Sequence, residues 1–132
     1  MDFKKVMDEF RNKFMPGKEW EKSKGIRRKF LGHDVIQSQD YSIQVDQDQY
    51  IREHVKPIDL PEHRRKLSDE EKCTKPEIKQ LQSGNGVGIW VIAQTRPDAA
   101  CQVSMVAAEI GKNPTLGTIR RYNKVVATLL QR

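Results

Sequence analysis

The chain has 132 residues, of which 36% are hydrophobic, 32% charged and 7% aromatic. This length suits one domain, whose core must be thin or completed from outside the chain. The longest apolar run, 89–93, is far too short to cross a bilayer, and no apolar leader follows the charged start, so we expect a soluble, intracellular protein without membrane contact. The formal net charge of +6 favours a polyanionic partner such as nucleic acid, although many basic proteins bind none.

The first predicted element is an amphipathic helix over residues 3–14. Asp2 precedes its first turn, and Pro16-Gly17 stops it. Its apolar positions recur at helical spacing and therefore share one face: Phe3, Val6, Met7, Phe10 and Phe14.

A basic connection over residues 18–29 follows this helix. It is either a solvated loop or a surface that binds phosphates, and the sequence leaves both interpretations open. Two interpretations also stay open for Trp20, which can stack on a nucleobase or fold back onto the first helix. Two glutamates only partly offset the cations of this connection, which are Lys18, Lys22, Lys24, Arg27, Arg28 and Lys29.

Two strand-like segments come next, and together they predict one antiparallel β-hairpin. They cover residues 29–37 and 41–45, and the polar residues 38–40 between them suit a turn. We expect Asp46 to cap a short helix that ends before Pro57. The alternating side chains of the first strand are Leu31, His33 and Val35.

The middle of the chain predicts a linker followed by an interrupted helix. Residues 57–67 hold two prolines and few apolar anchors. Ser68 and Glu71 form a capping-box pattern, so a helix is expected to begin there and to restart at Pro76. The glycines at 84, 86 and 88 then loosen this helix, because each costs about 1 kcal/mol relative to alanine.

The C-terminal third predicts two amphipathic helices behind a buried segment. The run 89–93 is apolar on every side and is expected to be the most buried part of the chain. Thr95 with Asp98 gives a second cap pattern, Gly111 ends the helix that follows, and Asn113-Pro114 opens the last helix. The predicted inner faces are Ala99, Val103, Val106, Ala107 and Ile110 in the first helix and Leu116, Ile119, Tyr122, Val126 and Leu129 in the second.

No pattern in the sequence predicts a catalytic or metal site. The glycines at 84–88 match neither a dinucleotide-binding fingerprint nor a Walker loop. Asp46 and Asp48 are better explained by helix capping than by cation binding. The three histidines have no recognisable nucleophile beside them, and Cys73 and Cys101 are expected to be ordinary reduced thiols.

Three segments in order carry a resemblance to a known family. They are Phe30-Leu31-Gly32, then residues 43–51 with Ile43-Gln44-Val45-Asp46-Gln47 and Tyr50-Ile51, then Trp90-Val91-Ile92-Ala93-Gln94-Thr95-Arg96-Pro97-Asp98, with Val103-Ser104 beyond. In this order they resemble the reverse transcriptase of copia-type LTR retrotransposons, part of the pol polyprotein. The Thr-Arg-Pro-Asp block is the specific signal, and the resemblance covers roughly residues 30–124.

The resemblance implies an α+β chain: an N-terminal helix, one antiparallel hairpin and a small helical bundle. By position, 1–56 would be the palm-end helix and primer-grip hairpin, 57–76 a linker, and 77–132 thumb and connection. Phe30, Leu31 and Gly32 would lie near the primer terminus, with Gly32 allowing close backbone approach. The family-motif residues are Trp90, Gln94, Thr95, Arg96, Pro97 and Asp98, and the cap pattern gives Arg96 and Asp98 a structural role at least as strongly.

Polymerisation in this family needs paired aspartates that hold two magnesium ions. No Asp-Asp pair occurs in this chain, and the resemblance places that turn upstream of the first helix. We therefore expect a non-catalytic fragment, without a cofactor of its own, that binds RNA–DNA primer–template and docks onto the rest of the polymerase. Further phosphate contacts without base specificity are expected from Arg64, Arg65, Lys66, Arg120 and Arg121.

Two other expectations accompany this interpretation. The family has apolar residues where Gly84 and Gly88 stand, which predicts a weakened helix in a divergent copy. The alternative function is that of a structural or interaction protein, or a retroelement relic, without a nucleic-acid role. In that case exposed apolar surface on the first helix or at Trp90 would mark the contact.

Overall fold

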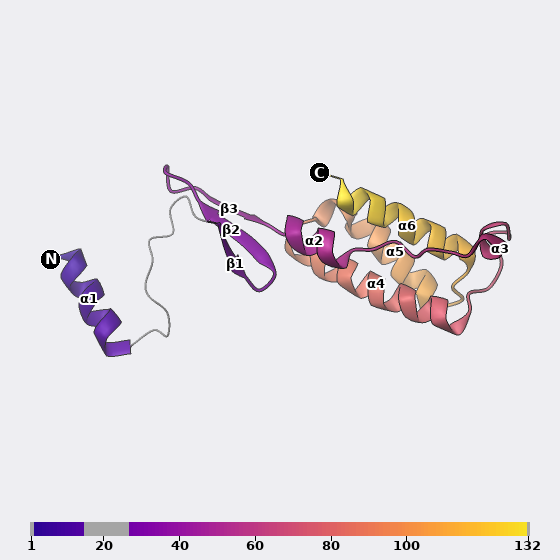
Figure 1. The fold of residues 1–132 in the computed structure, drawn as a ribbon, viewed down its shortest axis with the longest axis horizontal. Helices are drawn as coiled ribbons and strands as arrows, with labels where there is room; N and C mark the ends of the chain where they lie inside the picture. Colours follow the sequence, from indigo (N-terminus) through magenta and orange to yellow (C-terminus); the bar gives the residue numbers. More distant parts are fainter. Residues whose placement is uncertain (1, 15–26, 132) are drawn as a thin grey trace.

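The computed structural model describes residues 2–14 and 27–131, and it confirms the α+β class. A helix, a three-stranded sheet and a helical bundle follow one another along the molecule, and α1 is set apart from the other two parts (Figure 1). None of the described helices has the length and apolar composition needed to traverse a lipid bilayer. The elements are α1 (Phe3–Phe14), β1 (Arg27–Phe30), β2 (His33–Gln37), β3 (Ile43–Asp46), α2 (Asp48–His54), α3 (Glu62–Arg65), α4 (Lys75–Gln94), the 3-10 turn η1 (Pro97–Ala99), α5 (Ala100–Ile110) and α6 (Leu116–Leu130).

The prediction of a single strand over residues 29–37 is wrong, because the chain reverses in its middle. Phe30 pairs with His33, so Leu31 and Gly32 form a two-residue hairpin turn. Both have positive φ, 50° and 80°, as a type I′ turn requires, and glycine adopts this conformation without steric cost. The spacing of Leu31, His33 and Val35 at every second position had the pattern of one continuous strand, although a turn lies within it. The sheet is consequently a meander of order β1-β2-β3 instead of one hairpin.

The second turn and the first short helix lie close to their predicted places. The backbone N–H of Ser38 donates to the carbonyl of Ser42 at 2.8 Å, which closes the β2–β3 turn. Helix α2 begins at Asp48 with Gln47 as its N-cap, so the predicted cap is displaced by one residue. Asp46 still contributes, because its Oδ1 accepts the N–H of Asp48 at 3.3 Å.

The core lies in the bundle of α4, α5 and α6, and the predicted inner faces of the last two helices are confirmed. Helix α5 packs against both α4 and α6. Gly111 caps the C-terminus of α5, as predicted. Each large apolar side chain buried in this way contributes about 1.5–3 kcal/mol. The core residues of these three helices are Leu81, Val91, Val103, Val106, Leu116, Ile119, Tyr122, Val125, Val126 and Leu129.

Helix α4 departs from prediction at its start. It begins at Lys75, not at Ser68, because Thr74 and Glu77 form the capping box: the backbone N–H of Thr74 donates to Glu77 Oε1 at 3.5 Å, and the backbone N–H of Glu77 donates to the Thr74 side chain. Pro76 therefore falls in the first turn, where its missing N–H costs nothing. The residues around Ser68 form a turn, in which the N–H of Glu71 donates to the Ser68 carbonyl.

The glycines at 84, 86 and 88 do not interrupt α4, and Gly84 has a packing role. A Cβ at position 84 would overlap the hydroxyl of Tyr122 on α6 and lie 2.6 Å from its Cζ. A Cβ at Gly88 would be in ordinary contact with Val103 on α5. Gly84 thus permits the close approach of α4 and α6, which corrects the expectation that it only weakens the helix.

The run 89–93 is buried on one face only. Val91 is fully buried, whereas Ile89 is 49% exposed and Trp90 39% exposed. The expectation of maximal burial is therefore wrong. The run belongs to a helix on the outside of a three-helix bundle, which buries only one face of each helix.

Residues 55–61 form an extended strap along the bundle. Ile58 and Leu60 are buried in the core, while Pro57 and Asp59 between them are exposed. Asn123 on α6 holds the strap: its Oδ1 accepts the N–H of Ile58 at 2.8 Å, and its Nδ2 donates to the Ile58 carbonyl at 2.9 Å. The first part of the predicted linker is thereby a component of the core.

Candidate nucleic-acid interface

The predicted interface lies at β1 and the hairpin turn after it. Phe30 and Leu31 are 68% and 72% exposed at the turn, and the three basic residues of β1 are also exposed. Gly32 packs against the ring of Tyr50 on α2, where a Cβ would lie 3.3 Å from Cδ2. Four predicted residues, Lys18, Trp20, Lys22 and Lys24, lie outside the described residues.

The sheet register separates the basic residues of β1 between two faces. Cross-strand partners share a face, so Arg28 and Phe30 lie with Val35 and Val45. Arg27 and Lys29 lie on the opposite face, which α2 adjoins. The hairpin can therefore present cations on both sides of the turn.

Arg27 forms ion pairs within the protein. Its guanidinium contacts Asp34 at 3.0 Å and Asp46 at 3.6 Å, and Asp34 is only 3% exposed. A buried carboxylate needs such a partner, since an unpaired buried charge is costly. Lys29 and the exposed turn residues are consequently the described part of the predicted interface most available to a phosphate backbone.

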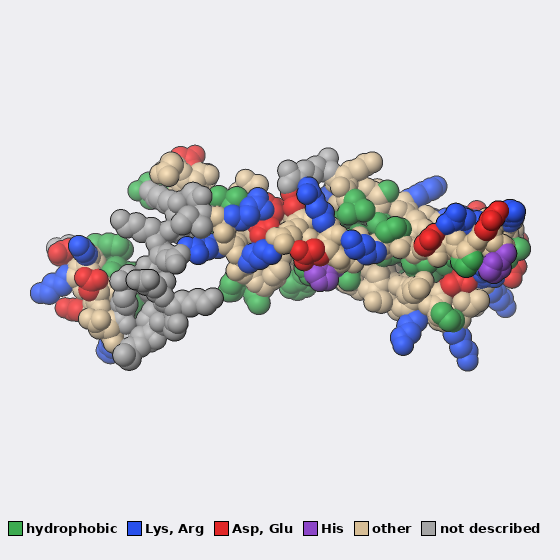
Figure 2. Space-filling view, in the orientation of Figure 1, with side chains coloured by type: hydrophobic (Ala, Val, Ile, Leu, Met, Phe, Trp, Pro, Cys, Tyr) green, Lys and Arg blue, Asp and Glu red, His purple; other side chains and the backbone are tan. Residues whose placement is uncertain are grey.

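The basic residues predicted to bind phosphates from the bundle are all paired within the chain. Figure 2 shows basic side chains interspersed with acidic ones, both over the sheet and α2 and near α3. An ion pair within the chain reduces the number of counterions that a phosphate contact could release, so these residues are weaker candidates than Lys29 of β1. The pairs are Arg64–Glu77, Arg65–Asp59, Lys66–Glu62, Arg120–Asp69 and Arg121–Glu109.

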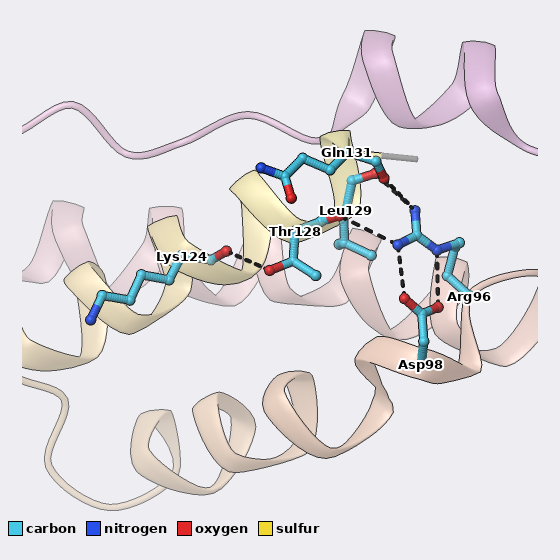
Figure 3. A network of polar contacts seen from close by, with 6 residues as sticks. All are labelled: Arg96, Asp98, Lys124, Thr128, Leu129 and Gln131. Carbon is cyan, nitrogen blue, oxygen red and sulfur yellow. Dashed lines mark hydrogen bonds and ion pairs between the residues drawn. The ribbon is translucent and has the colours of Figure 1, made fainter.

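Arg96 of the Thr-Arg-Pro-Asp block caps the C-terminus of α6 (Figure 3). Its guanidinium donates to the carbonyls of Leu129, Gln131 and Thr128 at 3.1, 3.2 and 3.3 Å. These carbonyls have no partner inside the helix, and a cation also interacts favourably with the helix dipole there.

Asp98 orients the Arg96 guanidinium by a two-point contact. Nε and Nη2 of Arg96 donate to its two carboxylate oxygens at 2.9 and 2.8 Å. These hydrogen bonds hold the pKa of Asp98 below its ordinary value and raise that of Arg96. Pro97, between the two, begins η1. The pair therefore has a structural role, in which Arg96 contacts Leu129, 33 residues further along the chain.

The remaining family-motif residues meet the sheet end of the bundle. The hydroxyl of Thr95 donates to Oε1 of Gln47 at 2.8 Å, and Gln47 is 1% exposed. Trp90 meets His33 edge to face with ring centroids 6.1 Å apart. Gln94 ends α4 and is exposed. The block therefore joins the sheet, α4 and α6.

A groove of about 680 Å³ lies between the strap and α4, and sequence reasoning missed it. Its rim carries His54, Lys56 and Lys79, and its floor includes Ile58 and Tyr122. Only the tertiary fold brings the strap beside α4, so no sequence signal could have located it. Within the described residues, no group of three or more His, Cys, Asp or Glu side chains could hold a metal ion.

Cys73 does not have the surroundings of a catalytic thiolate. Burial, reinforced by Glu77, raises the pKa of Cys73 to about 11, so its thiol stays protonated at neutral pH. Cys101 is exposed on α5. Both are free thiols, as expected from the sequence.

Comparison of the chain with protein-family models, with curated proteins and with solved structures found no match.

Proposed function

We propose that the chain carries the primer-grip and thumb parts of a copia-type reverse transcriptase and binds RNA–DNA primer–template without catalysing polymerisation. The observation that carries this proposal is the exposed β1–β2 hairpin, which presents Arg28, Lys29, Phe30 and Leu31 at one tip. Cations that meet phosphates beside apolar side chains that meet bases or sugars are the usual combination at nucleic-acid surfaces. The ordered family motifs support the same proposal.

Binding is expected to be strongly salt-dependent and independent of base sequence. Each phosphate neutralised by a lysine or arginine releases counterions, and the logarithm of the affinity then falls linearly with the logarithm of the salt concentration. Titrating a labelled RNA–DNA hybrid at low and at moderate salt measures this slope. Absence of binding at low salt would contradict the proposal.

A paired substitution tests whether the hairpin is the contact. Arg28→Glu with Lys29→Glu removes two cations at the tip and should weaken binding and reduce the salt slope by about one for each phosphate that is no longer neutralised. Lys112→Glu with Lys124→Glu makes the same charge change at exposed positions of the bundle. Equal weakening by both double variants would show that net charge, and not the hairpin, governs binding.

The alternative, a structural or interaction protein, is favoured by exposed apolar side chains on α1 and on the sheet. Phe3 is 76% exposed on α1, and Ile43 and Val45 are 63% and 50% exposed on β3. Monomeric proteins rarely leave a large contiguous apolar surface uncovered. Sedimentation over a range of concentrations, combined with hydrophobic-dye binding, distinguishes this function: self-association without hybrid binding would favour the alternative.

A further inference from the structure

The groove between the strap and α4 is held open by contacts that the strap makes elsewhere. The Tyr122 hydroxyl on α6 donates to the Lys56 carbonyl at 2.9 Å, and Asn123 binds both polar groups of the Ile58 backbone. Gly84 gives the Tyr122 ring the space it needs. The strap is therefore fixed to α6 and does not close onto α4. These contacts keep the groove between the strap and α4 open in the folded protein.

The rim of the groove is positively charged and partly pre-positioned. The Lys56 ammonium donates to the Arg52 carbonyl at 2.6 Å, and the His54 ring stacks on Tyr50 with its Nδ1 3.1 Å from the Tyr50 carbonyl. Lys79 lines the opposite wall, on α4. Asp59, also in the lining, is paired with Arg65, which balances its negative charge, so the two lysines still give the rim a net positive charge.

The floor has a different chemistry from the rim. Pro57, Ile58, Val87 and the Tyr122 ring provide apolar surface, while Gln80 and Ser83 supply hydrogen-bonding groups along α4. The volume of about 680 Å³ lies within the usual range of small-ligand sites, which are mostly apolar with a few placed polar groups. An occupant should therefore combine an anionic group with a partly apolar body that carries hydrogen-bonding groups, as a nucleobase does.

We propose that this groove binds a nucleoside monophosphate, with the phosphate between Lys56 and Lys79 and the base over the apolar floor. Lysine binds phosphate as a point charge and donates up to three hydrogen bonds. The site lies on the bundle and does not depend on hairpin binding, so the two proposals can fail separately.

The test uses the whole chain labelled with ¹⁵N and titrated with adenosine monophosphate, adenosine and inorganic phosphate at constant ionic strength. Saturable shifts are expected at the amides of Lys56, Ile58, Lys79, Gln80 and Ser83, with the monophosphate binding most tightly. Shifts confined to the hairpin, or no shifts at millimolar ligand, would overturn the proposal. Equal affinity for inorganic phosphate would also overturn it, because the floor would then contribute nothing.

Two variants and their controls locate the site. Lys79→Glu should lower the affinity about tenfold or more, as expected for loss of a charge-assisted hydrogen bond. Lys75→Glu makes the same charge change one turn away, outside the lining, and should not. Ser83→Trp should fill the groove and abolish binding, whereas Gln82→Trp on the exposed side of α4 should leave it intact. A lower affinity in a control variant would contradict the assigned position.

Discussion

At the scale of single residues, the same residue type has different roles in one helix. Gly84, Gly86 and Gly88 are two positions apart in sequence, yet only Gly84 faces a side chain that leaves no room for a Cβ. Nothing lies within 4 Å of the Cβ position at Gly86. The free-energy cost of glycine in a helix is thus offset by packing at Gly84 and is not offset at Gly86.

Gly84→Ala is expected to destabilise the protein, and Gly86→Ala to stabilise it. The new methyl at 84 displaces Tyr122, which is held by its bond to Lys56, and such overpacking typically costs about 1–3 kcal/mol. At 86 the gain in helix propensity, about 1 kcal/mol at most, is unopposed. Urea unfolding of both variants measures the difference. Stabilisation by Gly84→Ala would mean that Tyr122 is not confined.

The Arg96–Asp98 pair predicts a pH-dependent contribution to stability. The pKa of Asp98 is lowered from its ordinary 3.8, mainly by hydrogen bonds from Arg96, so the folded state binds this proton less readily than the unfolded state. The stabilisation is therefore fully present above pH 3.8 and is lost as the pH falls through the lowered pKa. Asp98→Asn should be less stable than the unmodified chain at about pH 7, with a difference that shrinks in acid.

Thermal unfolding of the two proteins between about pH 7 and pH 2 checks this expectation. Other carboxylates with lowered pKa, including Glu109, whose burial is outweighed by bonds from Arg121 and Thr118, titrate in both proteins and cancel in the comparison. A difference that stays constant over the whole range would show that the carboxylate charge of Asp98 does not stabilise the Arg96 cap.

At the scale of elements, the strap depends on one side chain of α6. A segment with little secondary structure must satisfy its buried backbone groups by other means. For Ile58 both groups are satisfied by Asn123, which acts as a neighbouring strand would. The strap consequently packs Ile58 and Leu60 into the core without belonging to a sheet.

Asn123→Ala is expected to lower stability by about 1–3 kcal/mol, because it leaves polar groups of a buried residue unpaired. Lys124→Ala changes the next, exposed position and should stay within about 0.5 kcal/mol. Denaturant unfolding gives both values. Equal effects of the two substitutions would show that water replaces Asn123 as the partner of Ile58.

At the scale of the whole molecule, stability is concentrated at the C-terminal end. Every buried apolar residue of the described core lies between Ile51 and Leu129. Helix α1 has 12 residues and an exposed apolar stripe, and helices of this length are marginal in water without packing. The bundle and α1 should therefore differ widely in local stability.

Hydrogen exchange of the whole chain should show this gradient. Amides of α5 and α6 are expected to exchange at rates set by global unfolding, whereas amides of α1 exchange within seconds at neutral pH because the helix opens locally. Slow exchange in α1 would contradict this expectation and would indicate that its apolar stripe is covered in solution.

The sequence by itself determined α1, the β2–β3 turn, the inner faces of α5 and α6, and the Gly111 cap, because helical periodicity and turn chemistry act between neighbours in the chain. It indicated the basic tip of the hairpin. It could not show that Arg27 pairs with Asp34 while Arg28 lies on the other face of the sheet, because the pairing register of β1 and β2 determines both. Only the tertiary structure decided the roles of Gly84, Arg96 and the strap, whose partners lie 38, 32 to 35 and 65 residues away and leave no periodic signal.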